Sequence, residues 1–537
     1  MEMAGKIART CVYSLLFTGF LGFLGVACDN SSSLAPGLQV TIQHVDRVTG
    51  WVSGTLAVYG ANGEKVPLIL PGFADRSFGT DGTAILKMEG DIEARTVGVQ
   101  SGGRILLAGS FVDEKTGKWE AIILAFEGSG IRDDTFGVDG LTVFNDPKMD
   151  MKTADLLVQS DDSILLLINA GDSLIVIARY TADGYPDASF GEKGLVSIGD
   201  ETTGFRAGAL ALQQDQKIIC AATMNDLEDP SMASVFAGLR FDPSGSLDDT
   251  FRLIWWTGLE MMASSVGVQP GGKVVVVGSS LTPDELGYAM YRALPDGSQD
   301  PSFESGILYD KRRPQITFEG EAVALQSDGK ILISGNAHNT DNGQRSQFVA
   351  RQLQNGLTDD PFGTYPWQTG GLGAILARPY EEDSTCSDIA VQEDQKILIS
   401  GTSTDPSSQR KMAYVSRADI YGVYDLLFGV ESLYSLSDPE RDVSAAGLAL
   451  QKDGNVILAG SGSKGSTGER AFMLARILTG GLQSFKIRSN AGNPVTPQVK
   501  KDGTWKAVLQ NIETGTLTID VKYNGVTSKL AHEFNPQ

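Results

Sequence analysis

The chain has 537 residues and a formal net charge of −22, with 66 acidic side chains against 44 basic ones. This balance excludes nucleic acid as an expected partner and argues against binding to an anionic membrane surface, because both repel an acidic protein that has no basic patch. The longest basic cluster is the short Lys-Arg-Arg run at 311–313. Hydrophobic residues make up 41% of the chain, which is enough for a large folded core.

Residues 1–27 have the pattern of an export signal. Lys6 and Arg9 precede an apolar run at 11–27, and a polar Cys-Asp-Asn-Ser stretch follows. A run this short is typical of a signal core rather than of a membrane span. The junction Leu-Gly-Val-Ala-Cys resembles a bacterial lipoprotein signal, and the resemblance implies acylation of Cys28. Gly25 stands where that pattern has leucine, so cleavage by signal peptidase I is the alternative.

Residues 28–72 lead from the signal into the folded part of the chain. Residues 28–37 are rich in serine and are interpreted as a tether. Residues 38–72 contain the stretches LQVTIQ and WVSGTLAVYG, which predict β-strands.

A repeated hairpin dominates residues 73–480. Its signature, LQSDGKILISGN at 325–336, places a glutamine before a turn and an apolar strand after it. Asp-Gly between two apolar runs predicts a type I′ turn, which needs positive φ at both central residues. Units with Gly-Gly or Asp-Gln in the turn are expected to turn less tightly. The glutamines that open the turns are Gln100, Gln159, Gln213, Gln269, Gln326, Gln392 and Gln451.

A second signature runs in phase with the first, with an aspartate three residues before a phenylalanine. A self-similar period of this length indicates an array of supersecondary units that bury their faces against one another. A residue type held at a fixed offset in every unit fills an equivalent structural position. The aspartates are Asp75, Asp133, Asp187, Asp248, Asp300, Asp359 and Asp425.

Each unit predicts four short strands and no helix. Continuous apolar strands such as KVVVVG need cover on both faces, and a radial array of four-stranded sheets supplies it. The third strands end at Phe126 and then at an arginine in each later unit, the last at Arg476. The segment Thr83–Met88 precedes the first hairpin and can complete the last sheet. The sequence therefore predicts an all-β chain with a seven-bladed β-propeller closed by an N-terminal strand, and an open solenoid is the alternative.

The order Gln-any-Asp-Gly-Lys, then Ala-Arg, then Asp-any-Ser-Phe-Gly resembles the delta-60 repeat of bacterial envelope and secreted proteins. The resemblance covers 73–480 and implies a β-propeller-like array. It implies no reaction, and it supplies no catalytic residues.

The C-terminal flank, 481–537, is similar to the back half of a bacterial immunoglobulin-like domain. The residues that carry this likeness are Asp-Gly-Thr-Trp at 502–505 and Gly-Thr-Leu-Thr-Ile at 515–519. The stretch VSGTL at 52–56 resembles one of the opening strands of such a domain. We therefore expect a small Ig-like β-sandwich split between 38–72 and 481–537, with the propeller inserted. Two unrelated β flanks are the alternative.

The recurrent arginines are predicted to staple each third strand to the Asp-any-any-Phe loop that follows it, through a charge-assisted hydrogen bond. In the first unit, where Phe126 takes the place of arginine, the loop is expected to be held by packing. The predicted structural residues are Arg179, Arg240, Arg292, Arg351, Arg417 and Arg476, with Asp133, Asp187, Asp248, Asp300, Asp359 and Asp425.

Nothing in the sequence has the spacing of a catalytic or metal site. The histidines are His44, His338 and His532, far apart in the chain, and the expected location of His338 is a solvated loop. Cys220 and Cys386 are the two cysteines beyond the signal, and Cys220 is interpreted as a small buried hydrophobe. The acidic turns lack the ligand order of an EF-hand loop. No catalytic, metal or cofactor site is predicted.

Aromatic side chains could also line a carbohydrate-binding rim, although core packing is the favoured interpretation for most of them. These residues are Trp255, Trp256, Tyr365, Trp367 and Tyr380.

The sequence therefore favours a non-enzymatic, lipid-anchored protein of the bacterial cell envelope that binds a protein or a glycan or serves as a scaffold. The membrane is expected to be a partner only through the N-terminal lipid. The alternative is an extracytoplasmic glycan hydrolase or lyase with carboxylates gathered at the mouth of the propeller.

Overall fold

The computed structural model describes residues 70–534 with short gaps, together with strands at 12–13, 26–27, 38–45, 51–59 and 65–66. Cys28 and the tether lie outside the described residues. The described part is all-β, and no stretch of it forms a helix that could cross a membrane. Contacts divide the chain into two compact units. The smaller consists of Met1–Phe73, Asp425–Ser432 and Leu478–Gln537, and the larger of Ala74–Tyr424 and Leu433–Ile477.

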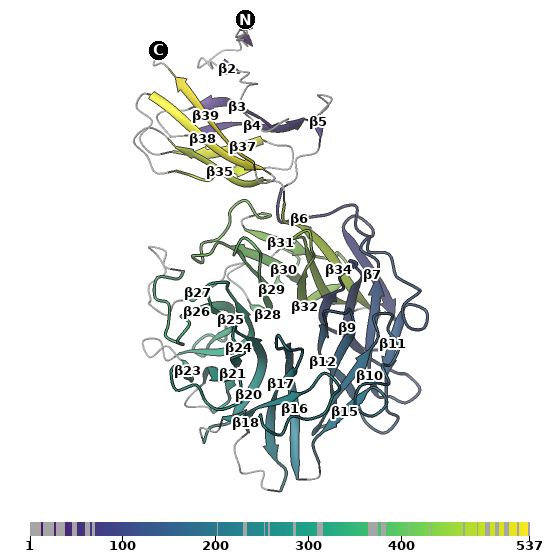
Figure 1. Cartoon of the computed structure of the whole chain (residues 1–537). Helices are drawn as coiled ribbons and strands as arrows, with labels where there is room; N and C mark the ends of the chain where they lie inside the picture. The colour runs from purple at the N-terminus through teal and green to yellow at the C-terminus, as the bar shows by residue number, and fades with distance from the viewer. Residues whose placement is uncertain are drawn as a thin grey trace, which may run out of the picture. The chain divides into compact units, whose positions relative to one another are not determined.

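The larger unit contains six antiparallel sheets of four strands, and in each sheet the strands are neighbours in chain order (Figure 1). The first three sheets are β8 (Ile92–Val99), β9 (Ile105–Val112), β10 (Trp119–Phe126) and β11 (Leu141–Phe144); β12 (Met151–Val158), β13 (Ile164–Ala170), β14 (Leu174–Tyr180) and β15 (Leu195–Ile198); and β16 (Thr203–Leu212), β17 (Ile218–Asp226), β18 (Val235–Phe241) and β19 (Leu253–Trp255). The next three are β20 (Met261–Val268), β21 (Val274–Ser280), β22 (Gly287–Ala293) and β23 (Gly306–Leu308); β24 (Ile316–Leu325), β25 (Ile331–Asn339), β26 (Arg345–Gln352) and β27 (Ala374–Leu376); and β28 (Ser384–Val391), β29 (Ile397–Thr404), β30 (Lys411–Ala418) and β31 (Leu433–Leu436).

A further sheet joins the two ends of the repeat region. It contains β32 (Asp442–Leu450), β33 (Val456–Ser463) and β34 (Arg470–Leu478), with β6 (Phe73–Ala74) and β7 (Thr83–Met88) paired to β34. In the β7–β34 pair, Ala84 lies opposite Leu474 and Leu86 lies opposite Phe472. This is the pairing that the strand order in the sequence predicted, and the structure confirms it.

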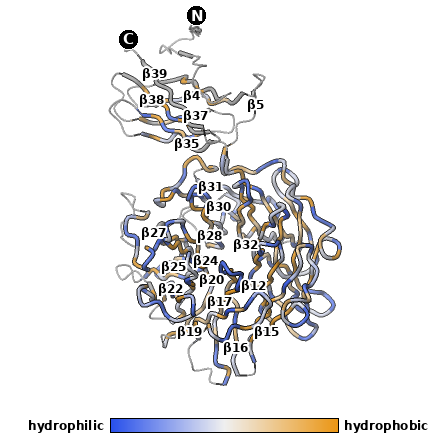
Figure 2. The backbone as a smooth tube through the Cα atoms, in the orientation of Figure 1, coloured by the Kyte–Doolittle hydropathy of each residue, from blue (hydrophilic) through white to orange (hydrophobic). Residues whose placement is uncertain are grey.

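The first strands of successive sheets contact one another from β8 through β12, β16, β20, β24 and β28 to β32, and β32 contacts β8. Figure 1 shows the sheets arranged around a common centre. The hydrophobic core lies between neighbouring sheets; one cluster, for example, joins Ile92 and Val97 of β8 to Ile457 and Phe472. Every residue of β21 is buried, because the strand is covered on both faces. Figure 2 shows the apolar strands of this unit in orange. The coarse fold is a β-propeller.

The hairpin turns differ from the predicted type I′ turn. In the fifth repeat the amide of Gly329 donates to the carbonyl of Gln326 at 2.9 Å. Gly329 has a φ of +80°, whereas Asp328 is not among the residues with positive φ. The turn is therefore type I followed by one left-handed residue, a pattern common in three-residue hairpin loops. In two Asp-Gln units that left-handed position is taken by Gln216 and Gln395, each with a φ of 65°.

The smaller unit combines strands from both flanks of the repeat region. One sheet has the order β3 (Leu38–Val45), β4 (Trp51–Tyr59), β37 (Thr504–Val508) and β36 (Gln498–Val499), with β5 (Lys65–Val66) paired to β4. The other has the order β35 (Leu482–Arg488), β38 (Gly515–Tyr523) and β39 (Val526–Phe534). Their core includes Val52, Leu56, Phe485, Trp505 and Ile519. A separate two-residue pair joins β1 (Val12–Tyr13) to β2 (Val26–Ala27).

Candidate functional site

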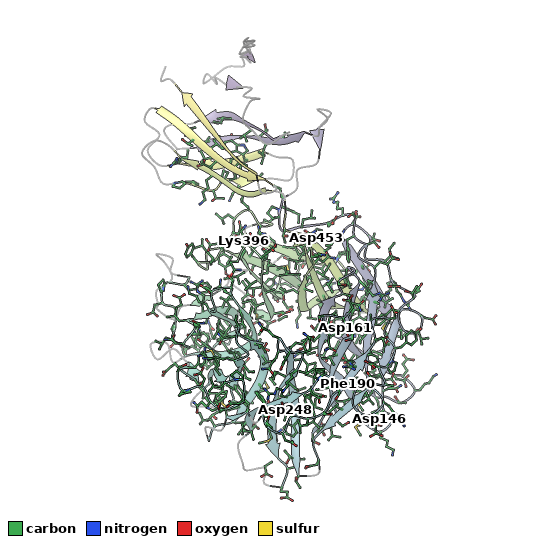
Figure 3. All side chains as sticks on the ribbon, in the orientation of Figure 1. Asp146, Asp161, Phe190, Asp248, Lys396 and Asp453 are labelled. Atoms are coloured by element: carbon green, nitrogen blue, oxygen red, sulfur yellow. The ribbon has the colours of Figure 1, made fainter. Side chains whose placement is uncertain are left out.

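The recurrent arginines lie beside the aspartates of the loops that follow them. Arg351 Nε donates to Asp359 Oδ2 at 2.8 Å, and Arg292 Nε donates to Asp300 Oδ2 at 2.9 Å. The same bond joins Arg179 to Asp187 and Arg240 to Asp248. Figure 3 labels Asp248 and Phe190, which belong to two successive loops of this kind.

Each of these guanidinium groups also reaches the next sheet in the ring. Nη1 of Arg240 donates to the carbonyl of Pro295, and Nη1 of Arg351 donates to that of Ile420. The guanidinium carbon of Arg351 lies 4.2 Å from the centre of the Phe362 ring, a cation–π distance. The arginine therefore holds together its own loop, the phenylalanine of that loop and the neighbouring unit.

The last arginine shows the same arrangement across the ends of the chain. Arg476 Nε donates to Asp75 Oδ2 at 2.9 Å, although 401 residues separate the two. Its Nη1 donates to the carbonyl of Gly128, in the turn that follows β10 of the adjacent unit. Arg417 is buried, and its Nη1 donates to Gln392 Oε1 at 3.4 Å. Its predicted partner Asp425 belongs to the other compact unit.

The first unit departs from the sequence-based expectation. Asp133 does not depend on packing alone, because Arg104 Nε donates to its Oδ2 at 2.6 Å. Arg104 Nη1 also donates to the carbonyl of Ala182, in the turn that follows β14 of the next unit. The expectation that packing holds this loop in place of an arginine was wrong, because the guanidinium of Arg104, in the turn before β9, reaches the same carboxylate. Arg104 occupies the position of lysine in the signature Gln-any-Asp-Gly-Lys.

The lysine of the signature is a functional part of the staple that sequence reasoning missed. Lys273 Nζ lies 2.7 Å from Asp300 Oδ2, and Lys217 Nζ lies 2.9 Å from Asp248 Oδ2. Burial alone would raise the pKa of Asp300. The hydrogen bonds from Lys273 and Ser302 and the charge of Arg292 outweigh burial and hold that pKa well below its usual range. The fixed position of the lysine in the repeat was the signal for this role.

The recurrent glutamine links neighbouring turns. Gln269 Nε2 donates to the carbonyl of Gly329 at 3.1 Å, and Gln269 Oε1 accepts from Arg292 Nη1 at 3.0 Å. Gln213 Nε2 donates to the carbonyl of Gly272 in the same way. The recurrent residues of the repeat thus form one polar cluster between units. It consists of the glutamine, lysine, arginine and aspartate, with the phenylalanine ring packed under the arginine. This structural role accounts for their recurrence without a catalytic role.

The other candidates from the sequence offer no reactive site. His338 lies within β25 and not in a loop, because the hairpin continues to Asn339. Cys220 is buried, and burial raises the pKa of its thiol to about 12. Trp255 packs against Phe236 and Tyr291. The described residues contain no group of three His, Cys, Asp or Glu side chains arranged for a metal ion. Trp256, Tyr365, Trp367 and Tyr380 lie outside the described residues.

The inner surface of the propeller carries charged residues that do not recur. Each first strand has a β-bulge at the same place, and the bulge adds one residue there. Bulges re-aim side chains and are frequent beside functional sites. We call these positions the axial bulge residues. They are Arg95, Ala154, Gly208, Ser264, Glu321, Ser387 and Ala446.

Two aspartates that follow the axial bulge residues bridge neighbouring sheets. Asp155 Oδ1 accepts from the amide of Leu156 and Oδ2 from that of Leu210, both at 2.8 Å. Asp388 accepts from the amides of Ile389 and Leu448 at 2.8 and 3.0 Å. Burial outweighs these hydrogen bonds and raises the pKa of each carboxyl to about 6. Both oxygens of each aspartate are used to join the inner strands.

Arg95 and Glu321 are the two axial bulge residues with long charged side chains. Arg95 is exposed, and its Nε donates to the carbonyl of Ala154 at 3.1 Å. Glu321 is half-buried, and its Oε1 accepts from Asn336 Nδ2 at 3.1 Å. Burial raises the pKa of Glu321 to about 7 against the opposing charge of Arg95, which also acts on Asp155 and Asp388. These four residues lie at or directly after the bulge of their first strands.

Glu321→Gln should make the protein more stable above neutral pH. The pKa of Glu321 is raised from 4.5 to about 7, so the folded chain binds this proton more tightly than the unfolded chain. Stability from this group is present below the unfolded pKa and is lost as the pH rises through about 7. We expect a gain of roughly 1–2 kcal/mol at about pH 8, reduced from the full shift by solvent screening. Urea unfolding at acidic and basic pH measures it.

The matched control is Glu93→Gln, because Glu93 is an exposed carboxylate on the first strand β8. It lies 3.8 Å from Lys152 as a surface ion pair, which contributes little to stability. An equal pH response in both variants would contradict a special environment for Glu321.

A match to a protein family agrees with the fold. A β-propeller family described as a domain of unknown function (DUF5122) matches residues 269–303 and 326–362. A search of curated proteins found no match to the chain. Among solved structures, the polysaccharide lyase Uly1 is similar with a TM-score of 0.46 and 10% identity, over 77% of this chain and 97% of that one. YCF48 bound to a D1 peptide gives a TM-score of 0.40 and 10% identity, over 76% and 100%. The N-terminal domain of Nup159 gives 0.35 and 11% identity, over 83% and 100%. Likeness at this level identifies no activity, and the chain is described by its β-propeller fold.

Proposed function

We propose that this protein is a non-enzymatic, lipid-anchored binding or scaffold module of the bacterial cell envelope, with a protein or a glycan as its ligand. The observation that carries the proposal is the use of the repeated polar residues. The guanidinium of Arg351, for example, donates to Asp359 and to the carbonyl of Ile420 and lies over the Phe362 ring. The repeat builds a rigid support, and ligand recognition falls to residues that do not recur.

We further propose a ring of seven blades closed by β7, joined to a split Ig-like sandwich. The pairing of β7 with β34 and the cyclic contacts of the first strands support the ring. Pairing between β4 and β37, with Thr55 opposite Thr504, supports a single domain assembled from both flanks. The domain limits that we propose are 38–72 and 481–537 for the sandwich and 73–480 for the propeller.

A glycan hydrolase or lyase is the second candidate. The observation that favours it is the position of Glu321, whose pKa of about 7 suits a general acid or base near neutral pH. Asp155 and Asp388 are less suited to catalysis, because their oxygens accept hydrogen bonds from backbone amides.

Incubation with host envelope proteins and soluble cell-wall glycans separates the candidates. The probe is the exported chain carrying Cys28→Ser, immobilised through its C-terminus. A binding module should retain a protein or glycan without changing its size, and chemical crosslinks should map to the propeller. Glycan shortening that disappears in Glu321→Gln would support the enzyme instead. Retention of nothing, with no shortening, would contradict both.

Lipidation has its own test. Cys28 follows the small residues Val26 and Ala27 at the end of the apolar run, so we expect a palmitate analogue to label the exported protein at this position. Cys28→Ser should lose the label and leave the membrane fraction. The control is Cys386→Ser, a buried thiol that should not affect labelling. Label that persists in Cys28→Ser would exclude the anchor.

A further inference from the structure

We propose that the axial surface of the propeller binds a neutral, hydroxyl-rich ligand, a saccharide, between Arg95 and Glu321. This inference rests on the proposed binding function and narrows it to one site and one ligand chemistry. It depends on four observations: where the two side chains lie, which of their atoms are unused, what charges surround them, and whether the fold needs them.

The two side chains occupy equivalent bulge positions in the first strands of different sheets. Arg95 comes from β8 and Glu321 from β24, and these strands are not neighbours in the cycle of first strands. The remaining axial bulge residues have short side chains. Those small residues are Ala154, Gly208, Ser264, Ser387 and Ala446.

Both side chains are anchored and still have polar atoms to offer. Arg95 is held through Nε, and Glu321 is held through Oε1. Within the part of the chain that the structure describes, Arg95 Nη1, Arg95 Nη2 and Glu321 Oε2 make no hydrogen bond. The two groups influence each other electrostatically, but the described ion pairs do not include one between them. A ligand between them could therefore accept from the guanidinium and donate to the carboxyl group.

The surrounding charges select the kind of ligand. Arg95 interacts electrostatically with Glu321, Asp155 and Asp388, and Glu319 also acts on Glu321. Carboxyl groups therefore outnumber the guanidinium among these residues and would repel a free anion. A small cation would be repelled by the positive charge of Arg95. A hydroxyl group is both a donor and an acceptor, and it satisfies both partners without adding charge. Adjacent hydroxyls on a sugar ring fit this pair of groups.

The fold itself does not need Arg95 or Glu321. The same bulge forms in the other first strands with alanine, glycine or serine at the equivalent position. The polar cluster that joins the repeats uses other residues, as in the bond between Arg292 and Asp300. Two charged residues that break the repeat at the bulge are therefore available for ligand recognition.

The test is isothermal titration of the full exported chain carrying Cys28→Ser. The neutral probes are cellotetraose, maltotetraose and chitotetraose, and the charged probes are tetragalacturonate and the glucosamine tetramer. We expect at least one neutral probe to bind more tightly than both charged probes. Arg95→Ala and Glu321→Ala should each weaken that binding about 10- to 100-fold, the usual loss for hydrogen bonds to charged groups. Lys87→Ala, in the outer strand β7, should bind like the parent chain.

Each outcome decides between the two proposals. Unfolding in urea confirms that the variants are folded, and Arg95→Lys should restore only part of the affinity, because lysine lacks the planar guanidinium fork. Saccharide binding that is unchanged in both alanine variants would overturn the axial site while leaving the binding function intact. Stronger binding of tetragalacturonate would overturn the neutral class. If no saccharide binds but an envelope protein is still retained, the axial proposal fails and the proposed function stands.

Discussion

Arg351→Ala should lower the free energy of unfolding by about 3–5 kcal/mol, because it strands a buried carboxylate. The side chains of Arg351 and Asp359 are 4% and 9% exposed, and they are joined at 2.8 Å. The substitution also removes the cation above the Phe362 ring and the donor to the carbonyl of Ile420. Lys330 Nζ, 3.3 Å from Asp359 Oδ2, should keep the loss from being larger. Urea unfolding followed by tryptophan fluorescence measures the change.

Arg345→Ala is the matched control, because Arg345 lies exposed at the start of the same strand, β26. It should change stability by less than about 0.5 kcal/mol, as surface substitutions usually do. Replacing Arg351 and Asp359 together by apolar residues should cost less than either single change, since no charge is then left unpaired. Equal stability of Arg351→Ala and the parent protein would show that the staple contributes nothing.

A disulfide between β7 and β34 should raise the free energy of unfolding by about 4 kcal/mol, because it closes a loop that spans almost the whole propeller. Ile85 lies opposite Met473 in this antiparallel pair, and facing residues in such pairs have Cα separations suited to a disulfide. Ile85→Cys with Met473→Cys should therefore oxidise readily, and the band should shift on non-reducing gels. Unfolding with and without reductant measures the gain.

The control for this crosslink is a cysteine pair that is shifted by one residue in the strand register. Leu86→Cys with Met473→Cys is displaced by one residue, and neighbouring residues on a strand project to opposite faces. That pair should form no disulfide. Crosslinking in the displaced pair, or none in the matched pair, would show that the two ends of the repeat do not meet in this register.

Much of the fold could be predicted from residue patterns because the repeat is local. Apolar runs such as Val274–Val277, flanked by turn residues, specify strands wherever they occur. The order of strands also placed Thr83–Met88 beside β34, because each complete sheet has four strands and the last repeat lacked one. The arginine and aspartate of one unit could be paired because they are eight residues apart, on a strand and the loop that follows it.

The turn and the first staple could not be predicted in the same way. Asp-Gly is compatible with more than one hairpin turn, and the length of loop between Gln326 and Lys330 selects type I with a left-handed Gly329. Arg104 is 29 residues from Asp133 and lies in the turn before β9, so its role depends on how that turn and the loop after β10 pack together.

The sequence by itself determined the β class, the repeating unit and the residues that hold each unit together, because these depend on local pattern and on short-range partners. Only the tertiary structure brought Arg95, Glu321, Asp155 and Asp388 to one axial region. Their strands are far apart in the chain, and a bulge in each first strand sets where the side chain points. When the sheets close around an axis, residues that share no sequence motif face the same inner surface. This closure depends on packing between sheets, and no local sequence pattern specifies that packing.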